Sequence, residues 1–231
     1  MADRRVLCFG DSLTWGWVPR SPPVPTERYV RDIRWTGVMA DQLGSDYSII
    51  EEGLSARTTT ADDPTDPRLN ASTYLPAALA THLPLDLAII MLGTNDTKSY
   101  LGRSAFDIGI GMSVLVGQVL AAAGGIGTLY PAPKVLIVAP PPLARIDDAW
   151  FEMTFAGGRE KTIELARVYE ALATFMGVEF LDAGSVIRTE GIDGIHFTEK
   201  NNLDLGIALA RRVRHILEAA DPGPATEHAD A

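Results

Sequence analysis

The strongest constraint on the fold is the alternation of short apolar runs with longer segments that have helical periodicity. Five runs of strand length are nearly continuously apolar, at residues 6–9, 47–51, 87–92, 135–139 and 178–181. Continuous apolar runs are typical of strands that are covered on both faces. Repeated strand–helix units build a parallel sheet between two layers of helices. The sequence therefore predicts a three-layer α/β/α fold with a five-stranded parallel sheet.

Two segments have the clearest helical pattern. Residues 159–176 repeat apolar side chains at helical spacing, and a last helix repeats them at Leu205, Leu209 and Val213. Thr198 precedes that last helix and is a candidate N-cap. Both segments fit helices that pack one apolar face against the sheet.

Three long loops follow the carboxyl ends of predicted strands, at residues 10–34, 53–72 and 140–158. Long ordered loops tend to carry function. Open α/β sheets bind their ligands outside the carboxyl ends of the strands. We therefore expect the functional residues at this edge of the sheet.

Length, charge and cysteine content narrow the class of protein. A chain of 231 residues fits a single domain, expected over residues 1–218, with a disordered tail over 219–231. The formal charge of −10 disfavours nucleic acid and anionic membrane surfaces as partners. The one cysteine, Cys8, forms no internal disulfide and cannot build a zinc site by itself, so we expect no metal. Without a signal-peptide core or a spanning segment, the expected location is cytoplasmic.

Four short motifs follow different predicted strands or lie near the C-terminus. They are Gly10-Asp11-Ser12-Leu13, Glu52-Gly53-Leu54-Ser55, Gly93-Thr94-Asn95-Asp96 and Asp193-Gly194-Ile195-His196. Each has an ordinary structural interpretation, as a turn serine, a bend, a turn cap or a packed histidine. Their order and spacing together favour a shared chemical role.

Acyl transfer from an ester needs a nucleophile, a base, a group that orients the base, and donors for the oxyanion. Ser12 is the candidate nucleophile, His196 the base and Asp193 the group that holds the imidazole. The candidate oxyanion donors are the backbone N–H groups of Ser12 and Gly53 and the side-chain amide of Asn95. The sequence thus predicts a serine esterase that requires no cofactor.

Other histidines, acidic pairs and a glycine motif do not form a competing site. His82, His215 and His228 have no acidic partner at a fitting spacing. The pairs Asp62-Asp63 and Asp147-Asp148 lack the spacing of a calcium loop, and we interpret them as solvated charges. Gly109-Ile110-Gly111 lies in a helical pattern and lacks the third glycine of a dinucleotide site.

Aromatic side chains crowd the loops expected around Ser12, among them Trp15 and Trp35. They fit either ordinary core packing or an apolar channel that favours an organic alcohol over water as acyl acceptor. The candidate channel residues are Asp11, Leu13, Trp17, Thr94, Lys98, Trp150, Phe151, Phe155 and Ile195.

The four motifs resemble the blocks of the GDSL or SGNH hydrolase family over residues 5–217. The strings GDSLTWGW, EEGLSARTT, DDPTDPRLN and LGTNDTK resemble its mycobacterial-type acyltransferase and aryl-esterase branch. The resemblance implies a flavodoxin-like SGNH fold with strand order 2-1-3-4-5. It also implies hydrolysis of small esters, transfer of the acyl group to alcohols or hydrogen peroxide, and a homo-oligomer.

Two alternatives remain open. A plain hydrolase could act on carbohydrate acetyl groups or on thioesters, and product analysis with an added alcohol would separate it from a transferase. A flavin-binding module could use the loop after the first strand, with Ser12, Thr14 and Trp15 around the flavin, and would purify yellow. The acidic balance and the Asp193/His196 pair oppose the flavin alternative.

Overall fold

A computed structural model describes residues 4–218. Five parallel strands form one sheet in the order β2-β1-β3-β4-β5. The strands are β1 (Arg4–Gly10), β2 (Tyr47–Gly53), β3 (Leu87–Met91), β4 (Lys134–Ala139) and β5 (Glu179–Asp182). The predicted fold class and strand order are confirmed, and the strand bounds differ from the prediction by at most a few residues. The tail predicted over 219–231 lies outside the described residues.

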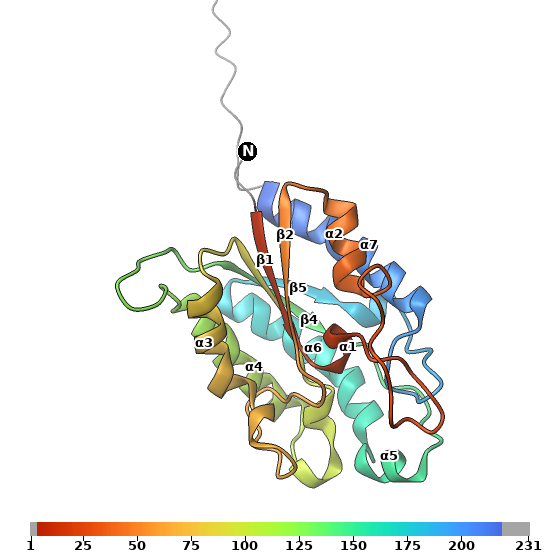
Figure 1. The fold of residues 1–231 in the computed structure, drawn as a ribbon. Coiled ribbons are helices and arrows are strands. Elements are labelled where there is room, and N and C mark those ends of the chain that lie inside the picture. Colours follow the sequence, from red (N-terminus) through yellow and green to blue (C-terminus); the bar gives the residue numbers. More distant parts are fainter. Residues whose placement is uncertain (1–3, 219–231) are drawn as a thin grey trace, which may run out of the picture.

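Helices cover both faces of this sheet (Figure 1). One layer contains α3 (Ala71–His82), α4 (Ala105–Leu120) and α6 (Gly158–Met176), and the other contains α2 (Trp35–Leu43) and α7 (Glu199–Glu218). Successive side chains of a strand point to opposite faces of the sheet. Alternate residues of each strand therefore pack in the two hydrophobic cores, one beneath each layer of helices. Leu7 and Phe9 join the first layer's core, whereas Val6 and Cys8 join the second layer's core.

Local capping fixes several helix boundaries. Ser104 and Asp107 form a reciprocal capping box at the start of α4. The Thr198 hydroxyl accepts a hydrogen bond from the Asn201 N–H at 3.2 Å, which confirms the predicted cap of α7. Helix α6 ends at Gly177, whose φ of 67° suits a residue without a side chain.

Short helices occupy the carboxyl edge of the sheet. These are α1 (Ser12–Trp15), η1 (Pro67–Leu69), η2 (Asn95–Thr97), η3 (Ser99–Leu101), α5 (Ala149–Thr154) and η4 (Ala183–Ser185). Figure 1 shows α1 and α5 at the same end of the sheet. The three long loops therefore meet where the sequence predicts the functional site.

Candidate active site

Ser12 is the first residue of α1, directly after β1. The Asp11 side chain caps this short helix by accepting the Leu13 N–H at 2.9 Å. Gly16 ends the helix in the left-handed conformation, with φ 93°. The helix thus holds Ser12 in a fixed position at the rim of the sheet, where the residue is only 6% exposed.

His196 joins Ser12 to Asp193 in one chain of hydrogen bonds. The His196 Nε2 atom lies 2.9 Å from Ser12 Oγ, and Nδ1 lies 2.7 Å from Asp193 Oδ2. The other Asp193 oxygen accepts the backbone N–H groups of Ile195 and His196. These hydrogen bonds close the turn between Asp193 and His196, so that a three-residue separation places both side chains in line.

The surroundings of His196 restrict its ring further. The Trp17 ring stacks on the imidazole with centroids 4.8 Å apart and an interplanar angle of 13°. Burial raises the pKa of the Asp193 carboxyl, but the hydrogen bond and charge of His196 outweigh it and leave that pKa below its ordinary value. Asp193 is therefore ionised at neutral pH and able to stabilise an imidazolium.

Asn95, the first residue of η2, lines the same cavity as Ser12. Its Nδ2 atom donates to Asp11 Oδ2 at 3.2 Å, and this contact fixes the plane of the amide. Asp11 is 1% exposed, and burial raises its pKa to about 7. The Asp11 side chain thus caps α1 and orients the Asn95 amide.

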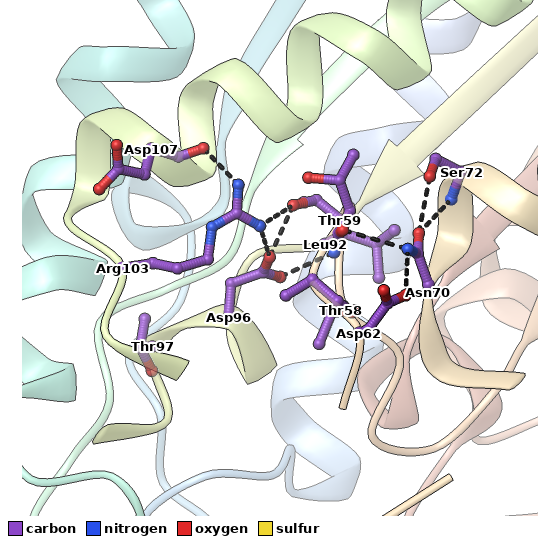
Figure 2. Close-up of polar contacts among 12 residues, drawn as sticks. Thr58, Thr59, Asp62, Asn70, Ser72, Leu92, Asp96, Thr97, Arg103 and Asp107 are labelled. Atoms are coloured by element: carbon purple, nitrogen blue, oxygen red, sulfur yellow. Dashed lines mark hydrogen bonds and ion pairs between the residues drawn. The ribbon is translucent and has the colours of Figure 1, made fainter. Parts of the chain in front are cut away.

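A polar network behind the site anchors η2 (Figure 2). Asp96 accepts the Thr59 N–H at 2.8 Å and the Thr59 hydroxyl at 2.6 Å, and it pairs with Arg103 Nη1 at 2.9 Å. Burial raises the pKa of Asp96 to about 6. Because Asp96 follows Asn95 directly, the network ties the position of the Asn95 amide to the 54–70 loop.

Gly53, the candidate oxyanion donor of the sequence analysis, is the last residue of β2. It does not line the cavity around Ser12, and a Cβ atom added to it would lie 2.4 Å from the Trp15 nitrogen. Gly53 therefore allows the backbones of β2 and α1 to approach each other. Ala56 lines the cavity instead, with φ 69°, and its N–H donates to no acceptor within residues 4–218.

A cavity of about 420 Å³ opens onto Ser12, Asn95 and His196. Six of the predicted channel residues line it: Trp17, Lys98, Trp150, Phe151, Phe155 and Ile195. The other three, Asp11, Leu13 and Thr94, are buried and do not line it, and Leu13 belongs to the core between the sheet and helices α2 and α7. Trp35 also packs in the core, where its Nε1 donates to the Leu13 carbonyl at 3.0 Å.

The side chains of His82 and Asp63 differ from their predicted environments. His82 Nε2 lies 2.8 Å from Glu52 Oε1, so this histidine does have an acidic partner, although it does not line the cavity. Asp63 is not solvated, because it is 3% exposed and pairs with Lys98 Nζ at 2.8 Å. Both pairs join residues that are at least thirty positions apart, which a local sequence pattern does not reveal.

Residues 4–218 contain no group of three or more His, Cys, Asp or Glu side chains that could hold a metal ion. None of the helices in this part of the chain is long and apolar enough to cross a membrane. The chemistry available at the cavity is that of a hydroxyl nucleophile, an imidazole base, a buried carboxylate and nearby N–H donors.

Residues 8–201 match the model of the GDSL-like lipase/acylhydrolase family. The native M. smegmatis aryl esterase is 69% identical, with a TM-score of 0.92 over 93% of this chain and 100% of that one. Est24, a carbohydrate acetylesterase from Sinorhizobium meliloti, is 64% identical, with a TM-score of 0.91 over 92% and 99% of the two chains. A putative arylesterase from Agrobacterium tumefaciens is 39% identical, with a TM-score of 0.81 over 93% and 100%. No curated protein matches the chain.

Proposed function

Since this chain belongs to the GDSL-like lipase/acylhydrolase family, we propose that Ser12 is the nucleophile with which it cleaves small carboxylic esters. The enzyme is a carboxylic ester hydrolase with serine-based catalysis, as the four motifs indicated. The observation that carries the assignment of residues is the hydrogen-bonded line from Ser12 Oγ through His196 to Asp193. Its two short contacts match the geometry that a serine–histidine–carboxylate triad requires.

In the acylation step, His196 Nε2 accepts the Ser12 hydroxyl proton while Oγ attacks the ester carbonyl carbon. Asp193 stabilises the imidazolium that forms. When the tetrahedral intermediate collapses, the bond to the leaving alcohol breaks, and His196 returns the proton to the alcohol oxygen. The product is an acyl-enzyme ester on Ser12.

The oxyanion of that intermediate requires donors that are already in place. We assign this role to the Ser12 N–H, the Ala56 N–H and the Asn95 side-chain amide. Ala56 replaces Gly53 in the assignment because Ala56 lines the cavity and its N–H has no acceptor in the described chain. The contact between Asn95 and Asp11 supports the assignment, since it fixes the amide before substrate binds.

The oxygen of water, an alcohol or hydrogen peroxide then attacks the acyl carbon while His196 accepts its proton. The bond from Ser12 Oγ to the acyl carbon breaks, and His196 returns the proton to Oγ. Transfer to an alcohol is supported by the apolar side chains that α5 and its flanks supply to the cavity, namely Trp150, Phe151, Met153 and Phe155. Apolar walls favour binding of an organic acceptor and limit the local concentration of water.

Deacetylation of a carbohydrate is the second candidate function. The 64% identity with a carbohydrate acetylesterase supports it, and so do the polar side chains that line part of the cavity, such as Ser55, Thr65 and Tyr100. Acetylated sugars compared with simple alkyl acetates would separate the two candidates by their kcat/KM values.

The decisive experiment is product analysis with a small acetate ester and a primary alcohol in buffered water, using Ser12→Ala as the control. A new ester formed by the wild type alone supports a Ser12-dependent acyltransferase. Acetic acid as the only product would restrict the function to hydrolysis. Turnover by Ser12→Ala at the wild-type rate would refute the assignment of the nucleophile.

We also propose that the protein forms a homo-oligomer, that it is cytoplasmic, and that residues 1–218 form one domain. A homo-oligomer is supported by three side chains along α4, Phe106, Ile110 and Val114, which are 66%, 51% and 44% exposed. Light scattering would give the subunit number, cell fractionation would test a cytoplasmic location, and limited proteolysis would test the single domain over residues 1–218.

A further inference from the structure

Lys98 is a buried cation in the wall of the substrate cavity. Its side chain is 8% exposed, and it lines the same cavity as Ser12 and Asn95. Lysine is seldom buried, because an ammonium group loses its hydration there. The position of Lys98 therefore calls for an explanation beyond packing.

The local backbone directs Lys98 toward the reacting centre. Lys98 follows η2, and its N–H donates to the Asn95 carbonyl at 3.3 Å, which closes one 3₁₀ turn. Residues three apart in a 3₁₀ helix eclipse each other, with an axial rise of about 6 Å. Lys98 thus stands on the same side of the turn as Asn95 and about one turn away from it.

The charge of Lys98 is balanced by one carboxylate. Nζ donates to Asp63 Oδ2 at 2.8 Å, and the Tyr100 hydroxyl donates to the same oxygen at 2.8 Å. Asp63 Oδ1 accepts the Thr65 N–H and hydroxyl. Burial raises the pKa of Asp63, but the hydrogen bonds from Lys98 and Thr65 hold it well below its ordinary value. Asp63 is therefore ionised at neutral pH, and its negative charge faces Lys98 Nζ.

The ammonium group has more donors than this pairing uses. It carries three N–H bonds, and Asp63 is its one hydrogen-bond acceptor within residues 4–218. Buried charged donors are stabilised when every N–H finds an acceptor. Nζ also lies over the Tyr100 ring, 5.9 Å from its centroid, but this contact is not a hydrogen bond to an acceptor atom. An N–H bond therefore remains for an oxygen atom of a molecule bound in the cavity.

We propose that Lys98 donates a hydrogen bond to a neutral oxygen of the substrate, a hydroxyl, ether or carbonyl group near the ester, and so selects oxygenated over hydrocarbon substrates. The proposal rests on the proposed esterase function of Ser12. A neutral oxygen fits better than an anion, because Asp63 already balances the charge and the chain as a whole carries −10. The selecting oxygen can belong to the alcohol part or to the acyl part of the ester.

Two matched pairs of esters test the proposal and separate those sources. Propyl acetate and 2-hydroxyethyl acetate differ by one oxygen in the alcohol part, and ethyl butyrate and ethyl methoxyacetate differ by one oxygen in the acyl part. For each pair, the readout is the ratio of kcat/KM for the oxygenated ester to kcat/KM for the hydrocarbon ester. Comparing this ratio between variants cancels the intrinsic reactivity of the esters.

Lys98→Met removes the donor but leaves the Asp63 carboxylate buried without its partner. The double variant Asp63→Asn/Lys98→Met avoids this, because an asparagine can still accept from Thr65. The matched control is Lys161→Met, which removes another lysine that contacts η2, through the Thr97 carbonyl at 3.3 Å, but does not line the cavity.

We expect the ratio for one pair of esters to fall about 10- to 100-fold in both Lys98 variants, since a hydrogen bond to a charged donor is lost. Lys161→Met should keep the wild-type ratio. Ratios within about twofold of wild type for both pairs would overturn the proposal. A fifth ester, the anionic monomethyl succinate, tests recognition of a carboxylate instead. A loss of kcat/KM in the Lys98 variants that is confined to this ester would also overturn the proposal. Failure of the esterase assignment itself is recognised separately, by Ser12→Ala retaining turnover.

Discussion

Asp11→Asn should remove a pH-dependent cost to stability. Burial raises the pKa of Asp11 from 3.8 to about 7. A carboxyl with a raised pKa stabilises the fold most at pH values below 3.8, and this contribution is lost as the pH rises through 7. Each unit of pKa shift corresponds to about 1.4 kcal/mol, so the full loss is about 4 kcal/mol. The asparagine variant carries no such titration.

The measurement is denaturant unfolding of wild type and variant between pH 5 and pH 8. The free energy of unfolding of Asp11→Asn, relative to wild type, should rise by about 1.4 kcal/mol per pH unit up to about pH 7 and then level off. The variant places the new amide at position 11 against the Asn95 amide, and this contact can lower the free energy of unfolding. Such a loss does not depend on pH, so it shifts the difference between variant and wild type by the same amount at every pH. Asp147→Asn is the matched control, since it makes the same chemical change at a side chain that is 71% exposed.

A difference between Asp11→Asn and wild type that does not change with pH would refute this reasoning, because it would mean that Asp11 ionises in the fold as it does in water. The same variant should lose turnover at pH 8 by about tenfold or more, since Asn95 loses the acceptor that orients its amide. Stability and turnover would thus change in opposite directions.

Three further substitutions test the site. Asn95→Ala should lower kcat about 100- to 1000-fold with little change in KM, because one oxyanion donor is lost. Steady-state kinetics on a small acetate ester would show this, and an unchanged kcat would remove Asn95 from that role. Gly53→Ala should lower both the unfolding free energy and kcat, since its Cβ would meet the Trp15 nitrogen at 2.4 Å; thermal unfolding and activity equal to wild type would contradict this packing role. Asp193→Asn should lower kcat about 10⁴-fold while the protein stays folded, because His196 loses the carboxylate that orients it; circular dichroism and kinetics together would check this, and a loss below tenfold would argue against the triad.

The strands and the hydrogen-bonded line from Ser12 through His196 to Asp193 could be predicted because their signals are local or ordered along the chain. Strands covered on both faces must be continuously apolar, and β1, β3 and β4 are. The turn from Asp193 to His196 places both side chains together within three residues. Parallel strands then bring the motifs to one edge of the sheet, because every strand ends there.

The proposed assignment of Ala56 rather than Gly53 as an oxyanion donor illustrates what a local sequence pattern leaves out. A glycine in a motif indicates close approach of a backbone, but the sequence does not say what approaches it. Here the Trp15 backbone does. Ala56 adopts a positive φ, which residues with a Cβ atom rarely do. An alanine at position 56 therefore does not indicate that the backbone turns its N–H toward the cavity.

Side-chain direction and long-range pairing account for the other differences. Leu13 lies next to the nucleophile in sequence, but in α1 it points into the core. Asp63 and Lys98 are 35 residues apart, and nothing in either local pattern indicates that they pair. The channel residues on α5 were predictable because aromatic side chains cluster there in the sequence itself.

The hydrogen bond between Ser12 and His196 joins residues that are 184 positions apart. Ser12 follows the interior strand β1, and His196 precedes α7, which packs against α2 on the same face of the sheet. During folding, contacts of such long sequence separation form at a high entropic cost. Ester turnover is therefore a reporter of completed folding: in a refolding experiment, catalysis should return only when α7 has docked, even if most of the helical signal has returned earlier.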